Sequence, residues 1–447
     1  MCLNVQFRSA VCGCFWNAYA LCLLGATSTI RQSGVRISDY FVGGKAIMAG
    51  KRRVFITGYG SVTRLHSGSE LVKQLCERSI AAADAELPFT YPIGEVDADL
   101  YGNGKFTRRM DRFALLAHLA VKHALCHADV NLEKLDRERA GVVMNTCYGP
   151  LDSTRRYITK LIREGARKVP AAVFPNTVHN AFTGLITIDL SVHGTNSTVS
   201  GYNPILYGVD MIRGGSDDLM IVGGCDELLN AIEIAFSAVG LLDARRTTAI
   251  RGMGGFASDV NSLVLGEGAA ALVLEGEECV EARGGKALAE IVDYGMANSL
   301  SDTFGAAFPA DARAVEFAMV QALRRGEVDA GDIGLVCASC NGLPTLARAE
   351  TQAIDRVFGS SDRPLISNAK SALGETLGAA AALSTMVAVD ALSQGVAPPI
   401  WGLAPSNLPR RYVAGSPAPV TSALALVNSV ELGGGTTSLL VKRWAAN

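Results

Sequence analysis

The sequence predicts an α/β protein with parallel-rich sheets that helices cover on both faces. Short, continuous apolar runs alternate with helical patterns from residue 53 onward, which is typical of strands buried on both faces. The runs fall into two groups, before and after about residue 280, and each group ends in two consecutive strands. We therefore expect two similar halves packed together.

Each expected element follows from its own apolar pattern. In the first group we expect strands at 54–57, 141–144, 219–224 and 269–275, with helices at 68–79, 113–127, 153–164 and 203–213. In the second group we expect strands at 288–293, 334–338, 364–367, 423–430 and 438–442, with helices at 312–325, 347–357 and 376–394.

Composition excludes several classes of protein. The 447 residues are 49% hydrophobic and 19% charged, which is too apolar for a disordered chain and sufficient for a large core. The formal net charge is 41 − 43 = −2. We therefore expect no dedicated binding of nucleic acid or of an anionic membrane.

The eleven cysteines are scattered and predict reduced thiols in the cytoplasm. Cys12 with Cys14, and Cys337 with Cys340, are pairs that lack a matching second pair or a nearby histidine. The glycine clusters at 223–224 and 433–435 fit neither phosphate-binding motif. We expect no metal and no cofactor.

Residues 1–47 differ from the rest of the chain. An apolar run at 11–25 resembles the core of a short signal peptide, but it is too short for a membrane span. The alternative is a start codon assigned upstream of Met48, after which a strand soon begins. We favour an extension of doubtful status over a working signal, because the sequence after Met48 is typical of a cytoplasmic protein.

Several motifs, in order, are similar to those of the β-ketoacyl synthases. They are 54–63 (VFITGYGSVT), 108–113 (RRMDRF), 218–224 (DLMIVGG), 266–275 (GEGAAALVLE), and 368–374 (NAKSALG) followed by 378–382 (GAAAA). The resemblance covers about 53–444. It implies a thiolase fold, in which two βαβαβαββ halves form a five-layered αβαβα core, normally as a dimer. We place the halves at 48–285 and 286–447.

The resemblance implies a cysteine nucleophile at a helix N-terminus, where the helix dipole favours the thiolate. Here the register from the following helix puts Thr198 at that position. A serine there would need a base, and no histidine is close in sequence. A purely structural interpretation, a turn and a helix N-cap around Thr198 with Gly201 and Pro204, explains the segment better.

Active relatives also use two histidines in the second half, to decarboxylate malonyl-carrier protein and to stabilise the enolate and oxyanion. None of the six histidines of this chain lies after His193. The first position is Ser339 and the second is Glu375, while the family's lysine remains as Lys370. We expect Lys370 and Glu375 to form either a buried ion pair or a residual charged pocket.

The paired phenylalanines of the family's glycine-rich gate correspond to Val430 and Leu432. Together these losses resemble the chain-length factors of type II polyketide and polyene synthases. That branch pairs with an active ketosynthase as a heterodimer, binds acyl carrier protein and shapes the acyl tunnel. Many of its members carry glutamine at the cysteine position, and this chain does not.

The resemblance places the loop after the strand at 141–146 at the subunit interface. Tyr148 and Leu151 lie three residues apart at a helix entrance and can project the same way. We expect them to face the partner's tunnel, and equally consider that they pack in their own core.

Two other functions stay open. One is a divergent 3-oxoacyl-ACP synthase or acyltransferase that uses Ser200 or Cys225 as nucleophile, although Asp226 and Glu227 would raise the pKa of a thiol beside them. The other is a homodimeric scaffold that binds acyl carrier protein. The acyl chain, its length and the pathway are not predicted.

Overall fold

The two halves of the chain have the same arrangement of strands. A computed structural model describes residues 51–78, 90–96, 104–242, 263–299, 307–359, 362–403 and 411–444. The first half contributes β1 (Val54–Thr63), β4 (Ala140–Asn145), β5 (Asn196–Val199), β6 (Leu219–Asp226) and β8 (Gly268–Gly276). The second contributes β9 (Ala289–Asn298), β10 (Ile333–Cys337), β11 (Leu365–Ser367), β14 (Leu424–Val430) and β15 (Gly435–Arg443).

Strand order and direction confirm the duplication. Across the sheet, the first half has the order β5-β4-β6-β8-β1 and the second has β11-β10-β14-β15-β9. If the five strands of each half are numbered 1 to 5 along the chain, both orders are 3-2-4-5-1. In each half the second, third and fourth strands are parallel, while the fifth pairs antiparallel with the fourth and the first. A short antiparallel contact between β1 and β9 joins the two sheets.

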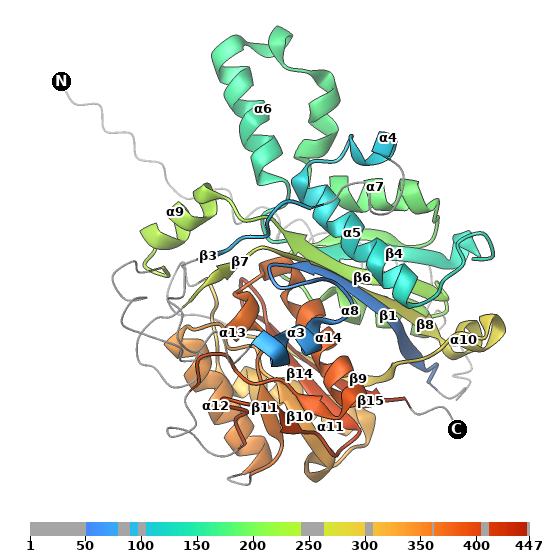
Figure 1. Cartoon of the computed structure of the whole chain (residues 1–447), viewed down its shortest axis with the longest axis vertical. Helices are drawn as coiled ribbons and strands as arrows, with labels where there is room; N and C mark the ends of the chain where they lie inside the picture. The colour runs from blue at the N-terminus through green and yellow to red at the C-terminus, as the bar shows by residue number, and fades with distance from the viewer. Residues whose placement is uncertain are drawn as a thin grey trace, which may run out of the picture. The chain divides into compact units, whose positions relative to one another are not determined.

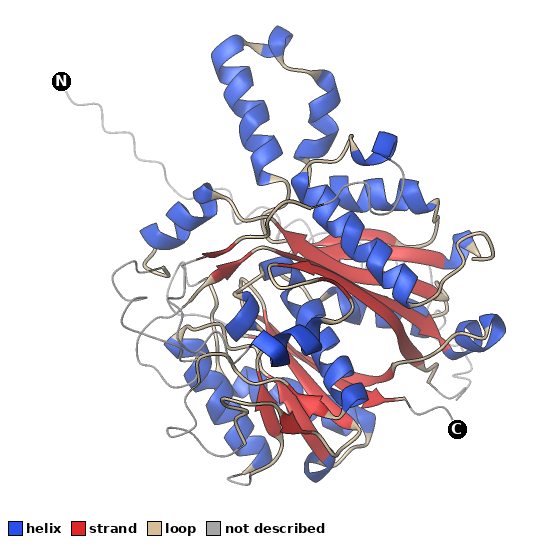
Figure 2. Ribbon diagram, viewed as in Figure 1, coloured by secondary structure: helices blue, strands red, loops and turns tan. Residues whose placement is uncertain are grey.

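Helices form the other three layers (Figures 1 and 2). The outer layers are α5 (Arg112–His127) with α7 (Ala181–Leu190), and α11 (Ala312–Gly326) with α12 (Pro344–Phe358). Between the sheets lie α8 (Pro204–Arg213) and α14 (Ala380–Gln394), whose apolar residues share one core with strands of both halves. The molecule thus has the αβαβα layers of the thiolase fold.

The middle layer explains the composition of α14. This helix touches both sheets, so it is apolar on every side and nearly all of it is buried. Leu377–Gln394 is the one described segment that is long and apolar enough to cross a membrane, and 89% of it is buried inside the fold. A core position between two sheets accounts for that hydropathy.

One segment stands away from the layers. α6 (Leu151–Glu164) and the turns η2 (Ala166–Lys168) and η3 (Ala171–Thr177) project from the rest of the molecule (Figure 1). We call residues 151–178 the arm. Ser153 is the only residue of α6 that is buried.

The remaining elements are short. They are α3 (Leu71–Arg78), α4 (Gly104–Thr107), α9 (Asn230–Ala238), α10 (Glu277–Arg283), α13 (Lys370–Leu373), β2 (Ser67–Gly68), β3 (Thr90–Tyr91), β7 (Leu265–Gly266), β12 (Val396–Ala397), β13 (Ala418–Pro419), η1 (Arg137–Arg139), η4 (Ala330–Asp332) and η5 (Leu377–Ala379).

The expected strands and helices are present within a few residues of their predicted positions, but β5, α7, α9 and α10 were not predicted. The apolar run at 11–25 and the start-site question lie outside the described residues. Arg52–Asn447 forms one compact unit, and the expected division at residue 285 falls between α10 and β9.

Candidate functional site

The second half brings three of the predicted site residues together. Ser339 follows β10 and Lys370 follows β11, and these parallel neighbours end at the same edge of the sheet. Lys370 Nζ lies 2.8 Å from Glu375 Oε2 and 3.2 Å from Ser339 Oγ. All three side chains are buried. Lys370 and Glu375 therefore form a buried ion pair at the edge of the sheet.

Glu375 is well supplied with hydrogen-bond donors. Besides Lys370, Asn341 Nδ2 donates to Glu375 Oε2 at 3.0 Å and the Leu377 backbone N–H donates to Oε1 at 3.1 Å. Burial lowers the pKa of Lys370, but the charge and hydrogen bond of Glu375, together with the charges of Glu431 and Glu350, outweigh burial and raise the pKa above its ordinary value. Lys370 is therefore held as the ammonium.

Ser339 beside Lys370 resembles a serine–lysine dyad, and its contacts show why it cannot act as one. A lysine that activates a serine must be neutral to accept the proton, whereas Lys370 is held protonated. Ser339 Oγ accepts from Lys370 Nζ and, at 2.9 Å, from the Val430 backbone N–H. Its own N–H donates to both oxygens of Glu350 at 2.9 and 3.0 Å. The serine is thus a structural link.

Two more buried carboxyl groups surround this pair. Glu350 accepts a hydrogen bond from Asn428 Nδ2 at 3.1 Å, and burial raises the pKa of Glu350. Glu431 lies between the two former gate residues and accepts from Ser429 Oγ at 2.6 Å. Burial raises the pKa of Glu431 to about 7. Because Lys370, the one cation among these groups, is already paired with Glu375, it is not free to stabilise the negative charge that develops on an oxyanion.

The structure corrects the expectation for Thr198. It lies in β5, opposite Met144 of β4, and its hydroxyl is 2.6 Å from that of Thr183. The next helix, α8, begins six residues later at Pro204, and its N-cap is Asn203. Gly201 forms the turn, with φ +63°. Thr198 thus has neither a thiol nor a helix N-terminus; the turn and Pro204 are confirmed, but the N-cap is not where we expected it.

Glycines let the turn after β5 approach the former gate. A Cβ on Gly201 would lie 2.8 Å from the Leu432 carbonyl oxygen, and one on Gly435 would lie 3.0 Å from the Gly201 carbonyl oxygen. Val430 is buried and Leu432 is half-buried, and both belong to the apolar cluster outside the second sheet. The turn after β5 and the segment that holds Val430 and Leu432 are therefore close together.

Sequence reasoning missed Cys147, which joins this region. The Gly201 backbone hydrogen-bonds to its thiol, and the charges of Asp226, Glu431 and Glu375 act on it. Burial, followed by those charges, raises the pKa of Cys147 well above its ordinary value. The thiol is therefore protonated at neutral pH and is a poor nucleophile. In the sequence, Cys147 could have been noticed because it lies two residues after the apolar strand β4.

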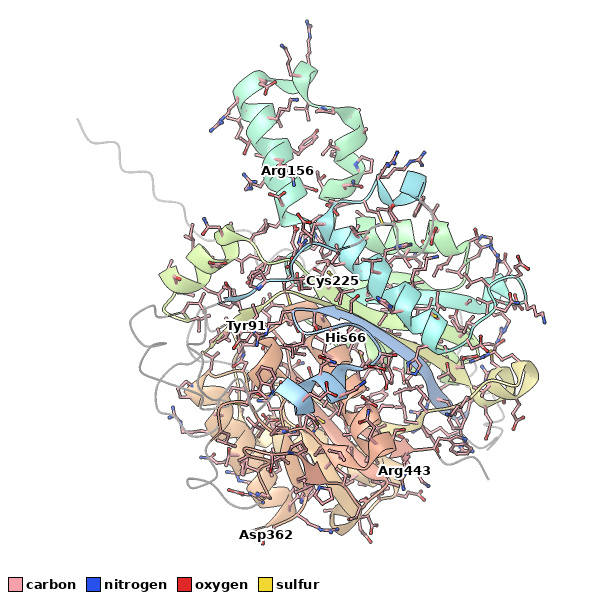
Figure 3. The ribbon with its side chains drawn as sticks, in the orientation of Figure 1. His66, Tyr91, Arg156, Cys225, Asp362 and Arg443 are labelled. Carbon is pink, nitrogen blue, oxygen red and sulfur yellow. The ribbon has the colours of Figure 1, made fainter. Side chains whose placement is uncertain are left out.

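The alternative nucleophiles have equally unsuitable surroundings. Cys225 is fully buried, and its thiol lies 3.5 Å from the Phe113 carbonyl oxygen (Figure 3). Burial, then the neighbouring carboxylates, raises its pKa well above the ordinary value. Ser200 directly follows β5 and is exposed. The nearest histidine in the sequence is His193, seven positions earlier. Within the described part of the chain, neither residue hydrogen-bonds to a basic side chain that could activate it as a nucleophile.

Tyr148 and Leu151 pack partly within their own chain. Both are half-buried in the apolar cluster that also holds the gate residues. The Tyr148 ring meets that of Phe236 on α9 edge to face, with centroids 6.4 Å apart. The structure thus places these two residues in the same apolar cluster as Leu432, and their role toward a partner stays a prediction.

Among the described residues, no group of three histidine, cysteine or acidic side chains is arranged to hold a metal. Cys337 and Cys340 are both buried, and burial raises each thiol pKa to about 12. Protonated thiols of this kind are poor metal ligands.

Known proteins resemble this chain along most of its length. The beta-ketoacyl synthase N-terminal domain matches residues 57–279 and the C-terminal domain matches 288–404. Nodulation protein E of Rhizobium sp. (strain N33) is 31% identical over 362 residues, 78% of this chain and 88% of that protein. The 3-oxoacyl-[acyl-carrier-protein] synthase 2 of Vibrio harveyi is 28% identical over 415 residues, 88% and 99% of the two chains.

The fold is also shared with solved structures. The ishigamide ketosynthase/chain length factor superposes with a TM-score of 0.75 at 21% identity, over 89% of this chain and all of that one. At that identity the likeness concerns the fold alone. Together, the domain matches and the relatives show that this chain belongs to the beta-ketoacyl synthase family.

Proposed function

We propose that this chain is a catalytically degenerate ketosynthase-like subunit, a chain-length factor, that pairs with an active β-ketoacyl-ACP synthase and shapes its acyl tunnel. The observation that carries the proposal is the buried Lys370–Glu375 ion pair with Ser339. These residues stand where the family resemblance leads us to expect two imidazoles.

The chemistry of the site supports inactivity. Decarboxylation of a malonyl group builds negative charge on the enolate, which needs hydrogen-bond donors or cations aimed at it. Here the one lysine is already paired with Glu375 and lies among further carboxyl groups. We therefore expect Lys370 to give a malonyl group little stabilisation at this position.

The relatives support the class of substrate. The synthase from Vibrio harveyi is named for an acyl-carrier-protein substrate, and the ishigamide structure pairs a ketosynthase with a chain length factor. By analogy, we assign this chain an acyl carrier protein and an intact ketosynthase as partners, in the cytoplasm and without a metal or cofactor.

The test compares the chain alone with the chain co-expressed with an intact ketosynthase from the same genome. We expect a stable complex by size-exclusion chromatography with light scattering. We expect acyl extension from malonyl-ACP, detected by mass spectrometry, by the complex and not by the chain alone. Turnover by the chain alone, lost on Ser200→Ala or Cys225→Ala, would overturn the proposal.

A matched variant, Thr198→Cys, tests whether the missing thiol is the only defect. It restores the thiol but leaves the ion pair in place, and catalytic groups that act as a unit are strongly non-additive. We therefore expect no malonyl-dependent extension from this variant alone. Extension would mean that Ser339 and Glu375 do not disable the site.

A further inference from the structure

Asp226 is a buried carboxylate, at the end of β6, that gathers four hydrogen bonds. The backbone N–H of Cys147 donates to Oδ2 at 2.9 Å and that of Tyr148 donates to Oδ1 at 3.0 Å. The Thr146 hydroxyl donates to Oδ1 at 2.8 Å. From the second half, the Gly378 N–H donates to Oδ2 at 2.8 Å. Asp226 itself is 1% exposed.

Three of the four donors belong to one loop, residues 146–149. β4 and β6 are adjacent parallel strands, so the loop after β4 begins beside the end of β6. The Thr146 hydroxyl also accepts from the Gly149 N–H at 2.9 Å, which closes the loop on itself. Gly149 has φ +63°, a conformation that suits glycine. One carboxylate thus determines the path of the loop that carries Tyr148.

The fourth donor ties this loop to the ion pair. Gly378 lies three residues after Glu375, whose side chain accepts from the Leu377 N–H. A Cβ on Gly378 would lie 2.6 Å from the Asn145 carbonyl oxygen and 2.8 Å from Asp226 Oδ2. A Cβ on Gly224 would lie 1.9 Å from the Gly378 carbonyl oxygen. The backbones of the two halves approach closely here, and the Asp226 side chain bridges them.

We propose that Asp226 is a positioning residue that holds Tyr148 in place and thereby sets the length of the product made by the paired synthase. This inference rests on the proposed function and deepens it. Asp226 acts through the loop rather than by touching the acyl chain. A carboxylate suits this role because it accepts hydrogen bonds at both oxygens and donates none.

The test variant is Asp226→Asn, which keeps the shape but turns one acceptor into a donor facing backbone N–H groups. The matched control is Glu227→Gln, the next residue, which accepts from the Asp152 N–H and not from the loop. Hydrogen exchange, measured on the chain alone, should be at least about tenfold faster at residues 146–149 in Asp226→Asn and unchanged there in Glu227→Gln.

The second readout is the length distribution of products from the reconstituted pair. Asp226→Asn should shift it in the same direction as Tyr148→Ala, while Glu227→Gln should leave it unchanged. If Asp226→Asn does not fold, Thr146→Val replaces it, because that variant removes one donor to Asp226 and the acceptor of Gly149.

Two results would overturn the inference. One is unchanged exchange at 146–149. The other is faster exchange with unchanged product length, which would separate the loop from length control. A wild-type pair that forms no complex or makes no product would instead refute the proposed function, while the exchange experiment still tests the role of Asp226 in the loop.

Discussion

The helices α6 and α12 are each the first helix after the second strand of their half, and they are used in opposite ways. Each follows the second strand of its half, β4 or β10. α12 packs on the second sheet and buries Leu346, Ala347, Ala349, Glu350, Ala353 and Ile354. α6 projects as the arm, and α7 packs against β4 in the first half instead. In the first half α7 thus fills the outer layer that α12 fills in the second, and α6 is left outside the layers.

The arm nevertheless keeps apolar side chains. Ile158, Leu161 and Ile162 of α6 are 47%, 37% and 78% exposed, and Phe174 of η3 is 55% exposed. Their spacing puts the three α6 residues on one face of the helix. Grouped apolar residues on a surface mark contact with another molecule. The comparison teaches that α12 buries its apolar side chains within the chain. α6 leaves its apolar side chains exposed, where the proposed partner could cover them.

The largest expected effect of a substitution lies in the buried second half. Glu375→Ala leaves Lys370 without its counter-charge at a site shielded from water. Removing one member of a buried pair costs about 3–5 kcal/mol. Urea denaturation should show that loss in the free energy of unfolding.

The control is the double variant Lys370→Met with Glu375→Leu. It removes both charges, so it should be much more stable than Glu375→Ala. A single variant as stable as wild type would show that Lys370 is neutral or reaches water.

Leu346→Ala, on α12, should come next. Leu346 is fully buried between α12 and the second sheet, so truncation loses apolar burial and leaves a cavity. We expect a loss of about 2–5 kcal/mol in unfolding free energy. A loss below about 1 kcal/mol would mean that α12 is no better packed than the arm, and the contrast between the helices would fail.

The same contrast explains how far the sequence predicts the fold. Continuous apolar runs predicted β4, β6, β10 and β14 because these strands are buried on both faces. β5 reads Asn-Ser-Thr-Val and has no apolar run, since it is an edge strand with one paired side. α7 mixes threonine and isoleucine, which do not indicate a helix. Thr198 was therefore placed near a helix when it lies in a strand.

The site shows a similar limit. Spacing around the lysine motif was enough to predict that Lys370 and Glu375 could pair, because they are five positions apart in the sequence. It did not predict that Glu350 and Glu431 join them, since those contacts depend on the packing of α12 and β14. Asp226 was considered only as a neighbour of Cys225, because its bonds to 146–148 and 378 arise from strand pairing.

Two buried glutamates, one near each of the compared regions, should make the stability of the fold depend on pH. Burial raises the pKa of Glu431, in the second half, and of Glu227, at the base of α6, from 4.5 to about 7. The folded chain thus keeps protons that the unfolded chain has released. Their contribution to stability is complete below pH 4.5 and is lost as pH rises through about 7.

Glu431→Gln should flatten the fall in unfolding free energy between pH 4.5 and 7 by an amount on the order of 1–3 kcal/mol. Glu227→Gln should remove a further part of similar size, because its pKa is raised from the same ordinary value to about the same value. Denaturation curves across that range measure both. An unchanged slope in Glu431→Gln would show that Glu431 is ionised in the folded chain.

The smallest effect on stability should come from Ile162→Ala on α6. At 78% exposure this side chain loses little burial, so the unfolding free energy of the isolated chain should change by less than about 0.5 kcal/mol. In the proposed complex the same side chain would be covered, and its truncation should weaken pairing although the fold is intact. Isothermal titration with the partner, beside denaturation of the chain alone, separates the two effects. If Ile162→Ala and Phe174→Ala both left the affinity for the partner unchanged, the arm would be exposed to solvent in the complex as well. The exposed apolar side chains of the arm would then need another explanation.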